Sequence, residues 1–256
     1  MDNLNRQLLD HIKALHGAGV EWLPRTSALE VANQSASPGA SAAEQLTSFG
    51  PTGDPELSNR RVALTTLAGE VKGCTRCAEL CSTRAQTVFG VGNPLAEVCF
   101  IGEAPGADED AKGEPFVGAA GQLLNKILAA SGFKREEIYI CNILKCRPPG
   151  NRTPLAEEAA NCRDFLERQL DMIAPKYIVA LGGCAATNLL QTTLSIAKLR
   201  GRFHVYRDSK LLVTYHPAYL LPNKDPSKKK EVWEDMKFLV NAMGRSLPES
   251  SSNTDG

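Results

Sequence analysis

Residues 98–106, with the sequence VCFIGEAPG, decide the fold of this chain. Their first four residues are apolar and include β-branched and aromatic side chains, which predicts a short buried strand, and the glycines and proline that follow predict a fixed loop. Similar apolar runs recur at residues 138–141, 177–181 and 211–214. Helical patterns follow at residues 122–130, 155–173 and 231–243. This alternation predicts a parallel sheet with helices on both faces, because crossover connections are right-handed.

Two features predict where individual helices begin. Thr153 is placed to cap the helix at 155–173, with Pro154 in its first turn. Apolar residues at helical spacing predict another helix that leads into Cys74. These residues are Val62, Leu64, Leu67 and Val71. The folded domain is therefore expected to begin near Arg60.

The two ends of the chain differ from its centre in composition. Residues 4–15 have the apolar spacing of a short amphipathic helix, and residues 32–55 are rich in Ala, Ser, Gly, Pro and Gln. The second segment has too few large apolar side chains to order itself, so we interpret it as a flexible linker. These patterns predict an N-terminal region at 1–60, a folded domain at 61–245 and a disordered tail at 246–256.

The overall composition excludes some functional classes. The 256 residues are 43% hydrophobic, enough for one packed domain, and they show no pattern of a membrane span or a secretory signal. The formal net charge is zero, so attraction to a polyanion has to come from a local excess of positive charge. Nine basic and two acidic residues lie between Lys198 and Lys230, which predicts either a solvated surface or a face for a phosphate backbone. We expect a cytoplasmic protein.

Eight cysteines in a reducing compartment favour metal ligation over disulfides. Cys74 and Cys77 form a CxxC pair that can bring two sulfurs to one centre, and Cys146 and Cys162 lie far downstream. Four thiolates suit zinc or an iron–sulfur cluster, although unrelated core cysteines would also give this spacing. Cys81 is an alternative local ligand. The remaining cysteines, in apolar contexts, are expected in the core: Cys99, Cys141 and Cys184.

Three further motifs place acidic, aromatic or imidazole groups in loops. Glu103 follows the first strand, at the end where parallel sheets bind ligands, although a turn with solvated acids has the same composition. Phe116 stands in PFVG at residues 115–118, either as a platform for a planar base or as a core residue. His216 follows the last strand in the segment YHPAY, either as a catalytic or as a structural side chain.

Together these motifs resemble those of family 4 uracil-DNA glycosylases in order and spacing. The matching segments are CxxC at 74–77, GEAPG at 102–106, PFVG at 115–118, NILKCRPP at 142–149, Cys162 and HPAY at 216–219. The similarity covers roughly residues 64–244. It implies a three-layer α/β/α sandwich with a central four-stranded parallel sheet. It also implies a [4Fe–4S] cluster held by Cys74, Cys77, Cys146 and Cys162, so that Cys81 is not a ligand.

The resemblance further implies a reaction and a set of site residues. Such an enzyme removes uracil from DNA in base excision repair by flipping the nucleotide out and hydrolysing its N-glycosidic bond. Glu103 and His216 are then catalytic. His216 stabilises negative charge at uracil O2, and Glu103 orients water or stabilises the sugar cation. The implied base-binding residues are Gly102, Ala104, Glu109, Phe116 and Asn142.

Several members of the base-binding set have a specific implied role. Phe116 stacks on the uracil, and the Asn142 amide reads its polar edge. Glu109 fills the space beside C5, where thymine carries a methyl group. Better-known uracil glycosylases have an aspartate where this chain has Ala104, which leaves Glu103 as the candidate that orients water.

Uracil-containing DNA is the expected partner, without a membrane or a nucleotide cofactor, and we expect a monomer. Candidates for phosphate contacts are Arg147, Arg152, Arg200 and Arg202. Two alternatives stay open on the residues alone. A zinc- or iron–sulfur-stapled nucleic-acid-binding module would use the same cysteines without chemistry. A nucleotide-binding α/β enzyme would use the glycines at 90–92 and 102–106, but the sequence completes neither common phosphate-binding motif.

Overall fold

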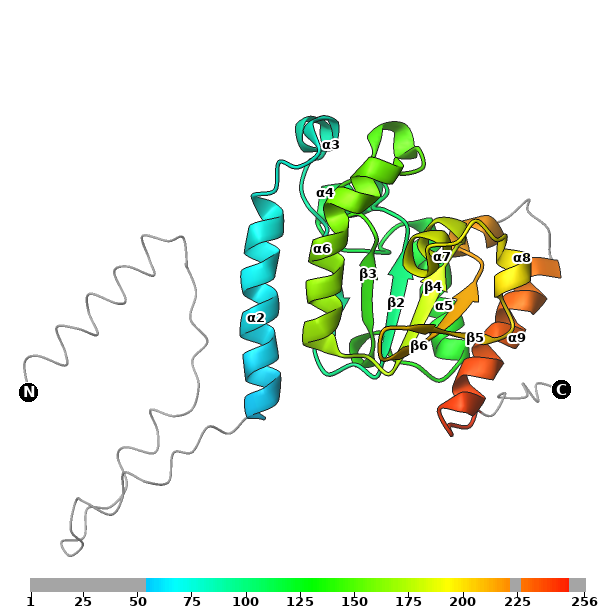
Figure 1. Cartoon of the computed structure of the whole chain (residues 1–256). Helices are drawn as coiled ribbons and strands as arrows, with labels where there is room; N and C mark the ends of the chain where they lie inside the picture. The colour runs from blue at the N-terminus through cyan, green and yellow to red at the C-terminus, as the bar shows by residue number, and fades with distance from the viewer. Residues whose placement is uncertain (1–53, 222–226, 249–256) are drawn as a thin grey trace, which may run out of the picture. The chain divides into compact units, whose positions relative to one another are not determined.

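The computed structural model describes residues 54–221 and 227–248, which Figure 1 shows in colour. The predicted helix at residues 4–15 lies outside the described residues, as do nearly all of the predicted linker and most of the predicted tail. The described part of the chain contains no helix that is long and apolar enough to cross a bilayer.

In the described part of the chain, six strands form one sheet in the order β1-β3-β2-β4-β6-β5 (Figure 1). The strands are β1 (Val91–Gly92), β2 (Val98–Gly102), β3 (Tyr139–Asn142), β4 (Tyr177–Leu181), β5 (Phe203–Tyr206) and β6 (Ser209–Thr214). The four central strands are parallel, which confirms the predicted parallel sheet. The prediction of four strands missed β1 and β5, which pair antiparallel at the two edges. Both are partly exposed and lack the long apolar run of a central strand, so their sequences carried little signal.

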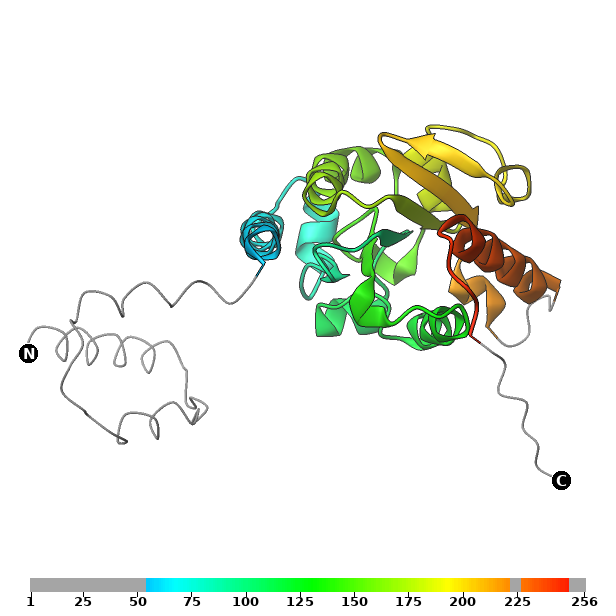
Figure 2. The same cartoon turned by 90° about the horizontal axis from the view of Figure 1, so that it is seen from below.

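Helices cover both faces of the sheet, as right-handed crossovers require (Figure 2). The α-helices are α2 (Pro55–Lys72), α3 (Ala78–Thr83), α4 (Ala107–Lys112), α5 (Ala119–Ala130), α6 (Ala156–Ile173), α7 (Gly183–Leu190), α8 (Ile196–Leu199) and α9 (Ser227–Ala242). Short 3-10 helices are η3 (Arg135–Glu137), η4 (Pro149–Asn151) and η5 (Pro217–Leu220). On one face α6 and α7 pack through residues such as Leu170 and Leu189, and on the other α5 and α9 pack through residues such as Leu128 and Leu239. This arrangement confirms the three-layer α/β/α fold class.

Helix α2 begins earlier than predicted and buries a narrower stripe. It starts at Pro55, and Asp54 Oδ1 accepts a hydrogen bond from the backbone N–H of Glu56 at 2.9 Å. The other three members of the predicted stripe are buried, but Val62 is 67% exposed. Val62 lies roughly 200° around the helix from Leu64, so the two residues cannot share one face.

Helix α6, which carries Cys162, begins at Ala156 and is not capped by Thr153 as predicted. The N-cap residue is Leu155, whose backbone N–H donates to Glu158 Oε2 at 2.8 Å. The Arg152 guanidinium holds the same carboxylate with two hydrogen bonds of 2.6 and 2.9 Å. The cap prediction was wrong because a glutamate in the first turn satisfies the helix end in place of a threonine hydroxyl.

The predicted site residues lie at one edge of the sheet, where the parallel strands end. β2 ends at Gly102, so Glu103 is the first residue of the following loop, and β3 ends at Asn142. β6 ends at Thr214, two residues before His216. This is the edge at which α/β sheets bind ligands. The topology therefore brings three segments that are distant in sequence to one place.

Candidate active site and cysteine site

A cavity of about 760 Å³ opens at the carboxyl edge of the sheet. Six of the seven predicted catalytic and base-binding residues line it: Glu103, Ala104, Glu109, Phe116, Asn142 and His216. Gly102, the seventh, does not line the cavity but packs against two side chains that do. A Cβ at this position would overlap Asn142 Oδ1 and come within 2.6 Å of Phe116 Cζ. The structure thus places the whole predicted set around a single cavity, and the absent side chain of Gly102 leaves room for the Asn142 amide and the Phe116 ring.

Asn142 presents an unsatisfied hydrogen-bond acceptor in this cavity. Its side chain is 2% exposed, and Oδ1 is the one buried side-chain polar atom without a partner among the described residues. A buried acceptor without a donor costs about 1–3 kcal/mol, so a native structure usually supplies a ligand or a water for it. The amide is therefore suited to a ligand that brings an N–H group.

His216 is a neutral imidazole with a defined tautomer. Its Nδ1 accepts a hydrogen bond from the backbone N–H of Ala218 at 3.2 Å, so the ring proton belongs on Nε2. Burial of the ring lowers the pKa of His216 to about 4, although the negative charge of Glu109 opposes that shift. The ring centroid lies 5.5 Å from that of Phe116, with 32° between the planes. At neutral pH His216 can therefore donate one hydrogen bond from Nε2 without carrying a charge.

Glu103 is held next to Asn142 by the backbone. Hydrogen bonds from Ile143 N to Gly102 O at 3.0 Å and from Leu144 N to Glu103 O at 3.1 Å extend the pairing of β2 with β3 beyond the strand ends. Burial raises the pKa of the Glu103 carboxyl, and a hydrogen bond from the Cys184 thiol partly offsets this shift. Glu103 is thus a fixed, partly desolvated carboxylate.

Glu109 has a role that the sequence did not predict. Its carboxylate accepts backbone N–H groups from Gly106 at 3.1 Å and from Val117 and Gly118 at 2.9 Å each. These bonds connect the start of α4 to the loop that carries Phe116. The available signal was a glutamate three residues after Gly106, which matches only the half of a capping box in which the carboxylate accepts the N-cap backbone N–H. Glu109 therefore braces the loop, and its place beside uracil C5 stays a prediction.

The braced loop holds Phe116 in an uncommon backbone conformation. Its φ angle is 55°, in the left-handed region that side-chain-bearing residues rarely adopt. A Cβ at Gly121 would overlap the Phe116 carbonyl, so the start of α5 packs directly against this residue. Strain of this kind costs about 1–3 kcal/mol and persists where the surroundings enforce it, often at functional sites.

The four predicted cysteine ligands also lie together. Cys74, Cys77, Cys146 and Cys162 line one small cavity, whereas Cys81 is not part of its lining. Three of the sulfurs accept hydrogen bonds. Arg84 Nη1 donates to Cys146 at 2.9 Å, and the backbone N–H of Lys145 donates to Cys162 at 3.3 Å. Asn161 Nδ2 donates to Cys77 at 3.6 Å. The described residues contain no group of three or more His, Cys, Asp or Glu side chains close enough to hold a single metal ion. The four cysteines thus share one cavity, and hydrogen-bond donors are directed at three of their sulfurs.

Comparison with known proteins identifies the family. A sequence model of the uracil DNA glycosylase superfamily matches residues 89–237, more than half of the chain. The chain belongs to this superfamily. It is 43% identical over 194 residues to a type-4 uracil-DNA glycosylase of Archaeoglobus fulgidus, covering 73% of this chain and 96% of that protein. A type-4 uracil-DNA glycosylase of Thermotoga maritima is 43% identical over 182 residues, covering 70% of this chain and 94% of that protein.

Identity to the type-5 group is lower. A type-5 uracil-DNA glycosylase of Pyrobaculum aerophilum is 30% identical over 183 residues, covering 59% of this chain and 80% of that protein. The stronger similarity to type-4 proteins confirms the resemblance that the motifs indicated.

Two of the four arginines expected to contact phosphates form ion pairs within the protein. Arg200 is 18% exposed in its side chain, and its guanidinium pairs with Asp235 at 3.0 Å and with Glu231 at 3.1 Å. Arg152 pairs with Glu79 at 2.7 Å as well as with Glu158. The phosphate interpretation of Arg200 is therefore replaced by a structural one. The sequence alone could not predict these ion pairs, because the partners of Arg200 lie more than 30 residues downstream in α9.

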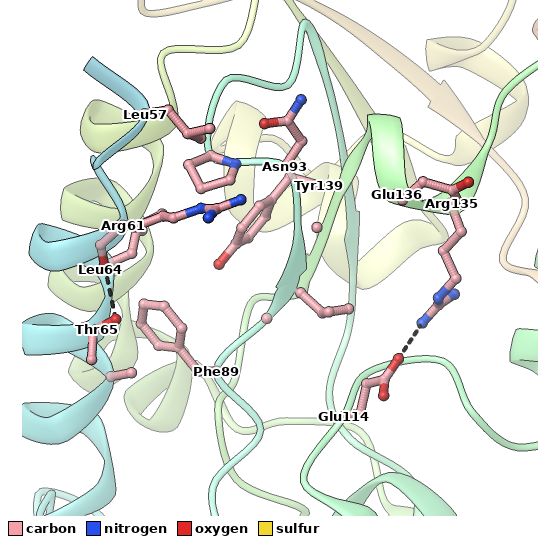
Figure 3. A pocket seen from close by; sticks show the side chains of 15 residues that line it. Leu57, Arg61, Leu64, Thr65, Phe89, Asn93, Glu114, Arg135, Glu136 and Tyr139 are labelled. Atoms are coloured by element: carbon pink, nitrogen blue, oxygen red, sulfur yellow. Dashed lines mark hydrogen bonds and ion pairs between the residues drawn. The ribbon is translucent and has the colours of Figure 1, made fainter. Parts of the chain in front are cut away.

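A second, larger cavity of about 910 Å³ lies between α2 and the β1 edge of the sheet (Figure 3). None of the predicted site residues lines it. Figure 3 shows Arg61 extending from α2 toward Tyr139, while Arg135 and Glu114 pair with each other at 3.4 Å. Because the unpartnered buried acceptor lies in the other cavity, the strand-end cavity is the candidate active site.

Proposed function

We propose that this chain is a DNA repair enzyme that hydrolyses the N-glycosidic bond of uracil in DNA and leaves an abasic site. The observation that supports it most directly is the unpartnered Asn142 Oδ1, which shares a cavity with Phe116 and His216. Uracil supplies what this cavity lacks, since N3–H is a donor for Asn142 and the flat ring suits Phe116. Membership of the uracil DNA glycosylase superfamily supports the same reaction.

Base recognition begins with eversion of the nucleotide, because the target bond is inaccessible inside a duplex. Stacking on Phe116 contributes roughly 1–3 kcal/mol and holds the ring. Asn142 Oδ1 then accepts the N3–H of uracil. Neutral cytosine has no hydrogen at N3, so it would leave the acceptor unpaired at a cost of about 1–3 kcal/mol. Discrimination of uracil from cytosine follows from a single buried acceptor.

Bond cleavage produces a uracil anion and a cationic sugar. The Nε2–H of His216 donates to uracil O2 as negative charge develops there, and it acts as a neutral donor because its pKa is about 4. Among the carboxylates that line the cavity, Glu109 is engaged by three backbone amides, and Asp108 is exposed. Glu103 is therefore the carboxylate that orients water or stabilises the cation.

The four cysteines that share a cavity are the candidate ligands of a [4Fe–4S] cluster, the group that the resemblance to family 4 implies. Hydrogen bonds from Arg84, Lys145 and Asn161 would stabilise the charged thiolates. The cluster would join the α2–α3 loop to α6 and the segment after β3, a structural task, since glycosidic hydrolysis transfers no electrons.

The proposed function is tested by incubating purified protein with an oligonucleotide that contains one U·G pair and then adding alkali. Strand breakage at the uracil, and none in the matched T·G and C·G duplexes, is expected. Purified protein should be brown and absorb light at about 400 nm. A cluster-loaded protein that binds the DNA without breakage would instead favour the nucleic-acid-binding alternative.

Gly102→Ala is expected to reduce the single-turnover rate of uracil release by about 10- to 100-fold, because small displacements of reacting groups have effects of this size. The added Cβ would overlap Asn142 Oδ1 and crowd Phe116. Gly69→Ala is the matched control, since a Cβ there has no neighbour within 4 Å. Wild-type rates in Gly102→Ala would show that the base does not bind above this residue.

Above about pH 5, the rate of release should depend on pH through Glu103 and not through His216. Glu103 acts as a carboxylate, and burial raises its pKa, so the rate should fall as the pH decreases through that raised value. A free histidine has a pKa of about 6.5. Because the pKa of His216 is about 4, the rate should show no change near the free value. Single-turnover rates between about pH 4 and 9 test this. A step near 6.5 that disappears in His216→Ala would contradict the neutral imidazole.

A further inference from the structure

A buried lysine lies behind the proposed base-reading residue. Lys145 is 1% exposed, and its Nζ donates to the backbone carbonyl of Asn142 at 3.0 Å and to Gln169 Oε1 at 2.6 Å. Both acceptors are neutral oxygens. Burial of an ammonium group is costly even when it is hydrogen-bonded, and an apolar side chain could fill the same volume at lower cost. This lysine therefore calls for a role beyond filling the core.

Gln169 extends the contacts of Lys145 to the other end of β3. Gln169 is fully buried in α6, and its Nε2 donates to Tyr139 Oη at 2.9 Å and to the carbonyl of Phe89 at 3.1 Å. Tyr139 begins β3 and Asn142 ends it. Buried networks whose members are all hydrogen-bonded make a structure more rigid. The lysine and the glutamine thus fix the strand that presents the Asn142 amide.

The backbone of Lys145 connects this network to the cysteine site. Its N–H donates to Cys162 Sγ at 3.3 Å, its carbonyl accepts from Val88 N at 2.8 Å, and the next residue is Cys146. The backbone of Lys145 is therefore fixed beside the cysteine site, while its side chain extends toward Asn142. A residue fixed in this way can set the position of Asn142 accurately.

We propose that Lys145 is a positioning residue for uracil recognition, which holds the Asn142 amide where its unpartnered Oδ1 accepts the N3–H of the base. The inference rests on the proposed function. The hydrogen bond to the Asn142 carbonyl fixes the backbone from which the amide projects. Gly102 has no Cβ, so Oδ1 packs closely against it, and the bond from Lys145 adds to the strand pairing that fixes the backbone of Asn142.

The first test is the substitution Lys145→Met, which keeps the length of the side chain and removes its donors. The single-turnover rate of uracil release should fall by about 10- to 100-fold. Absorbance near about 400 nm should persist, since the backbone N–H that meets Cys162 is retained. Tyr177→Phe is the matched control, because it removes a buried hydrogen bond of 2.9 Å to the Ala242 carbonyl, away from the site. It should leave the rate unchanged.

A double-mutant cycle with Asn142→Ala separates positioning from general stability. If Lys145 acts through the Asn142 amide, Lys145→Met should lower the rate by less than about 3-fold once that amide is gone. An equal loss in both backgrounds would overturn the proposal. If Lys145→Met fails to fold, Gln169→Met removes the second anchor of the ammonium group and is measured in the same cycle.

The cycle also distinguishes this proposal from the proposed function. Wild-type protein that releases uracil, together with additive effects of Lys145→Met and Asn142→Ala, would refute the positioning role alone. Cluster-loaded wild-type protein that releases no uracil would refute the proposed function, and the positioning role with it, because there would be no base for Asn142 to read.

Discussion

Replacing Cys146 with alanine should remove both the brown colour and the uracil-releasing activity of the purified protein. Cys146 is buried, and Arg84 Nη1 donates to its sulfur at 2.9 Å, so the substitution also deprives a partly buried guanidinium of an acceptor. Structural metal sites contribute on the order of 10 kcal/mol to folding, more than a usual core substitution removes. We expect the release rate to fall at least about 1,000-fold.

The effect should reach the active site because the cysteines come from separate segments. Cys74 and Cys77 lie in the loop between α2 and α3, Cys162 lies in α6, and Cys146 follows β3 by four residues. Asn142 is the last residue of that strand. Loss of the cluster would therefore release the segment that carries the base-reading amide, and lower both the melting temperature and the rate.

Cys81→Ala is the matched control for this prediction. Cys81 lies in α3, close in sequence to Cys77, but it does not line the cavity that the other four share. The variant should keep the absorbance near about 400 nm and the wild-type rate. Loss of the cluster in Cys81→Ala, with retention in Cys146→Ala, would show that the ligand set is wrong.

The central strands, and the grouping of the candidate site residues at one edge of the sheet, were predictable because local sequence patterns indicate them. Phe100, Ile140 and Val179 belong to short runs that are buried on both faces, and such runs have few other interpretations. Glu103 and His216 each follow such a run within a few residues, so the geometry of a parallel sheet brings them to one edge. Family resemblance then gave Phe116 and Asn142 their expected roles.

Features that depend on distant partners were not predictable. Arg200 belonged to a basic stretch, but its carboxylate partners lie in α9. In the same way, the contact of Lys145 with Gln169 arises only when α6 packs against the segment after β3. Long-range pairing decides whether a polar residue is structural or free to bind.

His216→Ala is expected to slow uracil release by about 100- to 1,000-fold while DNA binding is retained, because a single oxyanion donor contributes about this much. Burial lowers the pKa of His216 to about 4 and Nδ1 accepts from Ala218, so alanine removes a neutral Nε2–H donor and no charge. DNA affinity should therefore keep its dependence on salt. His204→Ala is the control, since His204 bonds to the Leu199 carbonyl at 2.7 Å outside the cavity. Equal losses of rate in the two variants, or a wild-type rate in His216→Ala, would mean that another group stabilises the departing uracil.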